Sequence, residues 1–236
     1  MNGIKKNIPN AVTSLNLLFG CISIIYALHN QLVDASWMIV YAAIADFFDG
    51  MAARLLKVSS PIGKELDSLA DVVSFGVAPG MIIYQLINTS PYSWIGLLVP
   101  IFAAIRLAKF NIDTRQTFYF IGLPTPANAL FIASFPLIIE HDHHWHSVYY
   151  SNISVAVWFF VCVAIACSAV MVSSIKLFSL KLKDTSWANN RTRYGFLLVS
   201  LACLLLLGYA AVPIIMVLYI IFSLFSKKSF DMPAAV

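Results

Sequence analysis

Four aspartates, Asp46, Asp49, Asp67 and Asp71, lie within or beside stretches that are apolar enough to enter a lipid bilayer. An ionised carboxylate at the centre of a bilayer costs at least ~2.5–3.5 kcal/mol. Four such groups therefore need partners, and divalent cations suit clustered oxygen ligands. These residues predict a site for a pair of divalent metal ions.

The first two aspartates belong to one helix face. Asp46, Asp49, Gly50 and Ala53 follow one another at i, i+3, i+4 and i+7, the spacing of residues on one side of a helix, and Arg54 flanks them. The small residues on this face leave room for a ligand to approach the backbone.

The second pair belongs to the next helix. Gly63, Asp67 and Asp71 lie at i, i+4 and i+8, again on one face. Ser60 and Pro61 precede them as the expected N-cap and first residue of that helix. Because the connecting loop is short, we expect the two helices to be antiparallel, with both carboxylate faces turned toward one point.

This order of residues resembles the signature of the CDP-alcohol phosphotransferase family. The match has no departure and reads Asp46-x2-Asp49-Gly50-x2-Ala53-Arg54-x8-Gly63-x3-Asp67-x3-Asp71. The resemblance implies an enzyme in which the four aspartates hold two divalent ions, Mg²⁺ or Mn²⁺. It also implies a nucleotide site at Pro9, Asn10, Gly50, Ala53, Arg54, Ser60 and Gly63.

Three further segments narrow the resemblance to the phosphatidylserine synthase branch of that family. They are DSLADVVSFGVAP at 67–79, RLAKFN at 106–111 and GLPTP at 122–126, and the resemblance covers roughly residues 8–185. The implied reaction transfers a phosphatidyl group from CDP-diacylglycerol to L-serine and releases CMP. Asp71 is the implied general base for the serine hydroxyl.

The serine carboxylate needs a cation, and Arg106 lies near the cytoplasmic end of the fourth expected helix. A planar guanidinium serves an anionic group well. Lys109 and Asn111 are weaker candidates for the serine site. The alternative is that Arg106 extends to lipid phosphates at the membrane surface.

Polar residues also mark the first apolar stretch. Pro9 and Asn10 come before Thr13 and Asn16, which are polar residues at helical spacing on an otherwise apolar span. In one interpretation Asn10 caps the helix and the hydroxyl bonds to the backbone. In the other, which the family resemblance favours, this helix end closes over the nucleotide.

The composition is that of a polytopic membrane protein. Of 236 residues, 60% are hydrophobic and 11% are charged, whereas soluble domains carry about 25% charged residues. Allowing about 20 residues per span, we predict an all-α transmembrane bundle of about eight helices, at approximately 11–29, 35–56, 63–87, 92–110, 124–139, 152–173, 194–208 and 210–225. The last two are short, so one kinked or re-entrant hairpin, with seven helices in all, is the alternative. We expect one domain over 1–236, with a catalytic core at about 8–185 and a C-terminal hairpin at about 194–226.

The basic residues predict the orientation. With the N-terminus in the cytoplasm and alternating helices, all 15 Lys and Arg residues fall on the inside, and the outside loops hold none. The positive-inside rule then predicts cytoplasmic termini and an acidic cluster near the cytoplasmic face of the cell membrane. The net charge of +4 is placed to meet a membrane surface, and we expect no nucleic-acid partner.

Three groups of residues lie outside the motif. Residues 140–146, EHDHHWH, hold four of the five histidines and could bind zinc or copper, but we expect a solvated loop on the outer face. Residues 176–193 are expected to form a basic loop attracted to anionic lipid. The four cysteines fall in apolar segments, where we expect them to pack.

Other functions remain open at this point. The same chemistry could use another alcohol, such as glycerol 3-phosphate, inositol phosphate, choline or ethanolamine, and the lipid donor could carry ether-linked chains. A cation- or proton-coupled transporter is the alternative from a different class, since intramembrane acids mark ion pathways. The clustering of the acids at one face and the lack of an internal repeat argue against it. The family resemblance also implies a homodimer.

Overall fold

The structure is a computed structural model, which describes residues 2–58, 60–88, 91–113, 119–178 and 187–225. Ten α-helices make up most of this part of the chain: α1 (Asn2–Leu28), α2 (Leu32–Leu56), α3 (Pro61–Val72), α4 (Ala78–Ile87), α5 (Leu98–Ile112), α6 (Thr125–His141), α7 (His143–Ser151), α8 (Ile153–Val172), α9 (Trp187–Leu207) and α10 (Ala211–Phe225). The π-helix η1 (Val73–Val77) joins α3 to α4, the 3₁₀-helix η2 (Tyr92–Leu97) leads into α5, and the 3₁₀-helix η3 (Gly208–Ala210) separates α9 from α10. Two short strands, β1 (Tyr119–Ile121) and β2 (Lys176–Phe178), form an antiparallel ribbon.

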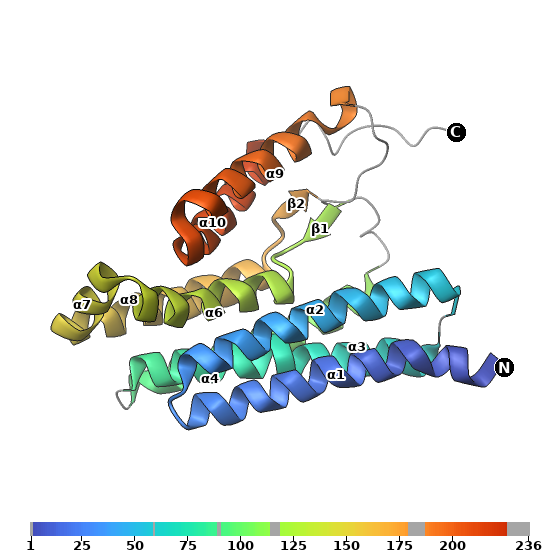
Figure 1. Cartoon of the computed structure of the whole chain (residues 1–236), viewed down its shortest axis with the longest axis horizontal. Coiled ribbons are helices and arrows are strands. Elements are labelled where there is room, and N and C mark those ends of the chain that lie inside the picture. The colour runs from blue at the N-terminus through green and yellow to red at the C-terminus, as the bar shows by residue number, and fades with distance from the viewer. Residues whose placement is uncertain (1, 59, 89–90, 114–118, 179–186, 226–236) are drawn as a thin grey trace.

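The helices pack in a bundle around an apolar core. Figure 1 shows α1, α2 and the continuous helix α3–η1–α4 running alongside one another, with α6 and α8 next to them. Helices α9 and α10 lie obliquely beyond α6, on the far side from α1. The core between these layers includes Ile39, Phe75, Ile82 and Ile132, all with no exposed surface.

The turn between α2 and α3 is built from local signals. Lys57 ends α2 in the left-handed conformation, with φ of 51°. Ser60 caps α3 by accepting a hydrogen bond of 3.0 Å from the backbone N–H of Gly63, and Pro61 occupies the first turn. The predicted N-cap of this helix is confirmed.

In the part of the chain that the structure describes, five segments are long and apolar enough to cross a membrane: Asn7–Leu28, Pro61–Ile87, Tyr92–Ile112, Ile153–Val172 and Arg193–Ser223. The last contains a break at Gly208, where φ is 54°, and α9 and α10 on either side of it pack against each other. The predicted hairpin of two helices is therefore the arrangement found. The prediction of an all-α polytopic bundle is confirmed.

Some details differ from the sequence-based expectation. Helix α1 begins at Asn2, nine residues earlier than expected, so Asn10 lies inside the helix and does not cap it. Residues 143–151 form the short helix α7 where a loop was expected, because the Asp142 side chain accepts a hydrogen bond of 2.9 Å from the N–H of His144.

The β1–β2 ribbon was not predicted either, since each strand is only three residues long. It pairs Phe120 with Leu177 and ties the segment before α6 to the segment after α8. The expected basic loop at 176–193 thus begins with a strand and ends within α9, while its residues 179–186 lie outside the described part.

Candidate active site

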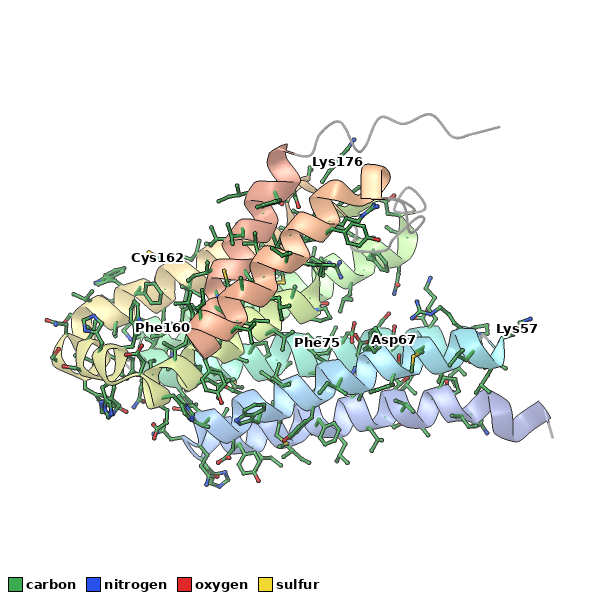
Figure 2. All side chains as sticks on the ribbon, turned by 45° about the horizontal axis from the view of Figure 1, so that its top comes forward. Lys57, Asp67, Phe75, Phe160, Cys162 and Lys176 are labelled. Atoms are coloured by element: carbon green, nitrogen blue, oxygen red, sulfur yellow. The ribbon has the colours of Figure 1, made fainter. Side chains whose placement is uncertain are left out.

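Three of the four aspartates converge between α2 and α3. Carboxylate oxygens of Asp46, Asp49 and Asp67 all lie within 4.8 Å of one another. Asp49 is buried, and one oxygen of Asp67 is buried without a hydrogen-bond partner. Figure 2 shows Asp67 in the same half of the bundle as Lys57, with Phe160 and Cys162 in the other half. The antiparallel arrangement expected from the spacing therefore brings both helix faces together.

Asp71 lies one turn further along α3 and is not in this group of three. It is buried, and it interacts electrostatically with Asp46 and Asp67. The side-chain amide of Asn16 donates a hydrogen bond of 3.3 Å to its Oδ1. Asp71 therefore has a different environment from the other three carboxylates.

Helix α1 supplies the polar partners of two aspartates. The Thr13 hydroxyl lies 2.6 Å from Asp49 Oδ2 and 3.0 Å from the carbonyl oxygen of Pro9. The shorter distance and the charge of the acceptor favour donation to the carboxylate. Asn16, three residues on, is fully buried and faces Asp71. The side chains of Thr13 and Asn16 thus orient one aspartate from each helix.

The π-helix η1 follows directly after Asp71. Its Ser74 is fully buried and donates a hydrogen bond of 2.9 Å to the carbonyl oxygen of Asn16. This contact and the Asn16–Asp71 hydrogen bond attach α1 to the α3–η1 helix at adjacent positions. Single π-helical turns occur frequently at functional sites, but nothing in the sequence of residues 73–77 signals one.

A cleft of about 260 Å³ opens beside the three clustered aspartates, and we call it the acidic cleft. It contains six of the seven predicted nucleotide-binding residues. Its lining consists of Pro9, Asn10, Thr13, Asp49, Gly50, Ala53, Val58, Ser60, Gly63, Lys64 and Asp67. The seventh, Arg54, is exposed and does not line the cleft.

The two glycines of the acidic cleft have different roles. Apart from the neighbouring backbone of its own helix, no atom of the described residues lies within 4 Å of the position that a Cβ of Gly50 would take, so this glycine leaves open space. A Cβ on Gly63 would instead lie 2.8 Å from Asn10 Oδ1 and 2.9 Å from Ser60 Oγ. Gly63 therefore allows the α1 side chain of Asn10 to approach the start of α3.

A second pocket, of about 440 Å³, lies at the end of α5, and we call it the Arg106 pocket. It is lined by Arg106, Lys109, Ile112, Asp113, Ile121, Met171, Val172, Ser173 and Ser174. Arg106 is only 7% exposed, and its Nε has no hydrogen-bond partner. The guanidinium carbon lies 5.3 Å from the centre of the Phe110 ring. Arg106 is thus enclosed by protein, which disagrees with the alternative that it extends to lipid phosphates.

The wall of the Arg106 pocket depends on a close approach between two connections. Gly122 follows β1 with φ of 74°, and its N–H donates a hydrogen bond of 2.9 Å to the carbonyl oxygen of Ile175. A Cβ at Gly122 would collide with the carbonyl oxygen of Met171. A glycine is therefore required to bring β1 against the end of α8, where Met171 and Ser173 line the pocket.

Asn111 lines neither the acidic cleft nor the Arg106 pocket. Its side-chain amide donates a hydrogen bond of 2.8 Å to the Ser68 hydroxyl, and its carbonyl oxygen accepts one of 3.4 Å from Lys64 Nζ. These contacts join α5 to α3 between the acidic cleft and the Arg106 pocket. Of the three predicted serine-binding residues, Arg106 and Lys109 line one pocket, and Asn111 holds two helices together.

The three clustered carboxylates fit a divalent cation site. They offer hard oxygen ligands, and among the described residues none of them forms an ion pair that would neutralise its charge. The buried Asp67 oxygen without a partner is the kind of atom that a cation would satisfy. By contrast, the histidines around α7 form no such group among the residues that the structure describes.

Comparison with known proteins agrees with this geometry. The model of the CDP-alcohol phosphatidyltransferase family matches residues 6–157, which include both aspartate-bearing helices and Arg106. The chain belongs to this family. The resemblance inferred from the motif is thereby confirmed, and the protein is a membrane-embedded transferase of phospholipid biosynthesis.

The names of three relatives in this family all refer to serine. A CDP-diacylglycerol–serine O-phosphatidyltransferase of Helicobacter pylori strain J99 is 35% identical over 222 residues, which cover 92% of this chain and 89% of the relative. A Bacillus subtilis protein of the same name is 42% identical over 122 residues, covering 50% of this chain and 69% of the relative. An archaetidylserine synthase of Methanothermobacter thermautotrophicus is 33% identical over 174 residues, covering 72% and 68%.

Proposed function

We propose that this protein transfers a phosphatidyl group from CDP-diacylglycerol to L-serine, giving phosphatidylserine and CMP. The observation that carries the proposal is the place of Asp71. It lies one turn beyond Asp67 on α3, where Asn16 donates a hydrogen bond to it, and α3 packs against α5, which carries Arg106 of the Arg106 pocket. A base in that position can serve an alcohol that binds on one side and a phosphate that binds on the other. The names of the three relatives support serine as the alcohol.

The acidic cleft is the proposed site of the cytidine diphosphate group. Pro9, Asn10, Gly50, Ala53, Ser60 and Gly63 would contact the nucleotide, with the open space at Gly50 admitting it. Lys64 also lines the cleft and offers a cation for a phosphate. Arg54 is proposed to bind phosphate from the exposed edge of the same helix face.

Asp46, Asp49, Asp67 and Asp71 are the residues that would hold two divalent ions, Mg²⁺ or Mn²⁺. When bound, such ions neutralise the diphosphate and stabilise the charge on the departing CMP. Thr13 holds Asp49 from α1, so the carboxylate is oriented before any ligand binds.

Asp71 is the proposed general base. Asn16 donates to Oδ1 and holds the carboxylate in place, and we assign Oδ2 as the oxygen that would accept the serine hydroxyl proton. The serine oxygen then bonds to the lipid-linked phosphorus, while the bond from that phosphorus to the oxygen of CMP breaks and CMP leaves with the electron pair. Base assistance of this kind typically contributes about 10²–10⁴-fold.

Arg106 is the proposed partner of the serine carboxylate, with Lys109 as a second cation in the same pocket. The guanidinium is buried, and its unpartnered Nε can donate to an anion. Serine held there by its carboxylate would present its hydroxyl toward Asp71, with which Arg106 interacts.

The orientation and assembly belong to the same proposal. The distribution of the 15 basic residues supports a multi-pass protein of the cytoplasmic membrane, with the acidic cleft and both termini on the cytoplasmic side. Cytidine nucleotides are available on that side. We propose a single domain over residues 1–236 that forms a homodimer, as the family resemblance implies.

The deciding experiment is CMP release by the purified protein in detergent with CDP-diacylglycerol and Mn²⁺, with and without L-serine. We expect release that depends on serine, is lost with a chelator and returns with Mn²⁺ or Mg²⁺. Release that ignores serine but responds to glycerol 3-phosphate or an inositol phosphate would keep the chemistry and replace the acceptor. If none of these alcohols supports CMP release, the proposal is contradicted.

A further inference from the structure

The continuous helix α3–η1–α4 and the segment η2–α5 approach each other along a line of small residues. A Cβ on Gly80 would lie 2.9 Å from the carbonyl oxygen of Gly96, and one on Gly96 would lie 2.6 Å from that of Gly80. A Cβ on Gly76 would lie 3.1 Å from the Cβ of Ala103 and 3.3 Å from the Cα of Pro100. We call these five residues the glycine seam. Because the two backbones are already in close contact there, the seam fixes how near the two helices come.

A hydrogen bond holds the cytoplasmic part of the same contact. The side-chain amide of Asn111 on α5 donates to the Ser68 hydroxyl on α3 over 2.8 Å. Ser68 and Gly76 are eight positions apart on one helix, and Ala103 and Asn111 are eight positions apart on the other. The two helices are therefore antiparallel and remain in register between these two contacts. Their spacing is set at both ends of this stretch.

Asp71 and Arg106 lie within the stretch. Asp71 comes three positions after Ser68, and Arg106 comes three positions after Ala103. In two antiparallel helices that face each other, residues that follow the contact residues by three positions project to the same flank of the contact. Both side chains are buried, with exposed fractions of 8% and 7%. The glycine seam therefore sets the distance between the carboxylate of Asp71 and the guanidinium of Arg106.

The guanidinium on this flank is suited to an anionic ligand. Arg106 lines a pocket, and its Nε is buried without a hydrogen-bond partner among the described residues. A buried donor in this condition is satisfied when an anion binds. An acceptor held there by its anionic group reaches Asp71 only if its hydroxyl lies at the matching distance. In L-serine two carbon atoms separate the carboxylate from the hydroxyl oxygen.

We propose that the glycine seam selects the length of the acceptor, by holding Asp71 and Arg106 at a spacing that fits an acid whose hydroxyl lies two carbons from its carboxylate. Gly76 is the positioning residue, because its lack of a Cβ lets Ala103, on the helix of Arg106, come close to the helix of Asp71. The inference rests on the proposed function, in which Arg106 binds the serine carboxylate and Asp71 is the base.

The test is Gly76→Ala, which inserts one methyl group into the seam. The new Cβ would lie 3.1 Å from that of Ala103, so α5 has to shift by a few tenths of an ångström. L-homoserine has one carbon more than L-serine between carboxylate and hydroxyl. We expect the ratio of kcat/KM for L-homoserine to kcat/KM for L-serine to rise about three- to tenfold. An unchanged ratio would overturn the inference.

A second substitution separates spacing from general stability. Adding Ala103→Gly to Gly76→Ala removes the opposing methyl group and allows the two helices to approach again. The acceptor ratio should return to within about twofold of the wild-type value, although a glycine in the interior of α5 lowers Tm further. If the double variant keeps the altered ratio of Gly76→Ala, the inference is overturned.

Gly80→Ala is the matched control, because the same methyl group enters the seam farther from Asp71. The new Cβ would lie 2.8 Å from Pro100 Cδ and 2.9 Å from the carbonyl oxygen of Gly96, so we expect a lower Tm. The acceptor ratio should stay within about twofold of wild type. An equal change of the ratio in Gly80→Ala would overturn the role of Gly76 by indicating a general loosening of the bundle.

Failure of the inference is distinguishable from failure of the proposed function. If the wild-type enzyme uses serine and Gly76→Ala leaves the acceptor ratio unchanged, only the inference falls. If the wild-type enzyme uses another alcohol, the proposed function falls, and the same variants are measured with that alcohol and its homologue with one more methylene group. A rise in that ratio supports the seam as the determinant of length, and an unchanged ratio overturns it.

Discussion

The acidic cleft and the Arg106 pocket differ in how the chain builds them. The lining of the acidic cleft comes from one continuous stretch, from Pro9 to Asp67, folded into three successive helices. The lining of the Arg106 pocket comes from three separate segments, with Arg106, Lys109, Ile112 and Asp113 from the first, Ile121 from the second and residues 171–174 from the third. Asp71 lies between them, because it follows Asp67 on α3 and α3 packs against α5, which carries Arg106. Local helix geometry thus creates one half of the site, and long-range packing creates the other.

The difference suggests a division of roles between the two halves. The acidic cleft has charged and small residues at fixed helical spacing, which suits a nucleotide and metal ions shared by all reactions of this chemistry. The Arg106 pocket depends on a ribbon of three-residue strands and a single guanidinium. A pocket assembled from separate segments can change its ligand without altering the motif. We therefore expect substitutions in the two regions to affect different substrates.

The largest effect is expected for Asp71, which lies between the acidic cleft and the Arg106 pocket. Asp71→Asn should lower kcat by about 10²–10⁴-fold, because the amide cannot take the proton of the alcohol. Binding of CMP, and of Mn²⁺ to the three aspartates that cluster without Asp71, should remain largely intact when measured by calorimetry. Normal turnover in this variant would remove Asp71 from the role of base.

Next in size is a change confined to the Arg106 pocket. Arg106→Ala should raise the KM for L-serine by about 10–100-fold, the loss expected for hydrogen bonds to a charged group. The KM for CDP-diacylglycerol should change little. Lys64→Ala, in the acidic cleft, should give the reverse pattern. A selective loss of nucleotide affinity in Arg106→Ala would contradict the assignment of the Arg106 pocket to serine and the acidic cleft to the nucleotide.

A smaller effect should follow when α1 no longer holds Asp49. Thr13→Val removes the 2.6 Å hydrogen bond and keeps the shape of the side chain. We expect the Mn²⁺ concentration for half-maximal activity to rise at least about tenfold, as for other residues that orient metal ligands. Ser14→Ala is the control, since its exposed hydroxyl donates a hydrogen bond to the carbonyl oxygen of Asn10 in its own helix. If Thr13→Val needs the same Mn²⁺ concentration as the wild type, the hydrogen bond from α1 is not needed to orient Asp49 as a metal ligand.

The smallest effect concerns the connection between the two regions. Ser68→Ala and Asn111→Ala both remove the 2.8 Å hydrogen bond between α3 and α5. Each should lower Tm by about 2–4 °C, which corresponds to roughly 1 kcal/mol in a chain of this size. The KM for serine should rise alike in both variants, or in neither. If the KM for serine rises in Asn111→Ala but not in Ser68→Ala, Asn111 contributes to serine binding.

The sequence by itself determined the acidic half of the site. Asp46, Asp49 and Gly50 share a helix face because the helical repeat is 3.6 residues, and the Ser60–Pro61 start of α3 follows from capping chemistry. The membrane spans follow from runs of apolar residues. These are local properties, in which each residue interacts with others a few positions away.

Only the tertiary structure decided which distant residues meet. The Thr13–Asp49 and Asn16–Asp71 hydrogen bonds join residues 36 and 55 positions apart. Asn111 bonds to Ser68 rather than lining a pocket. Such contacts depend on the angles at which whole helices pack, which are the sum of many side-chain contacts. No periodicity in a single segment contains that information.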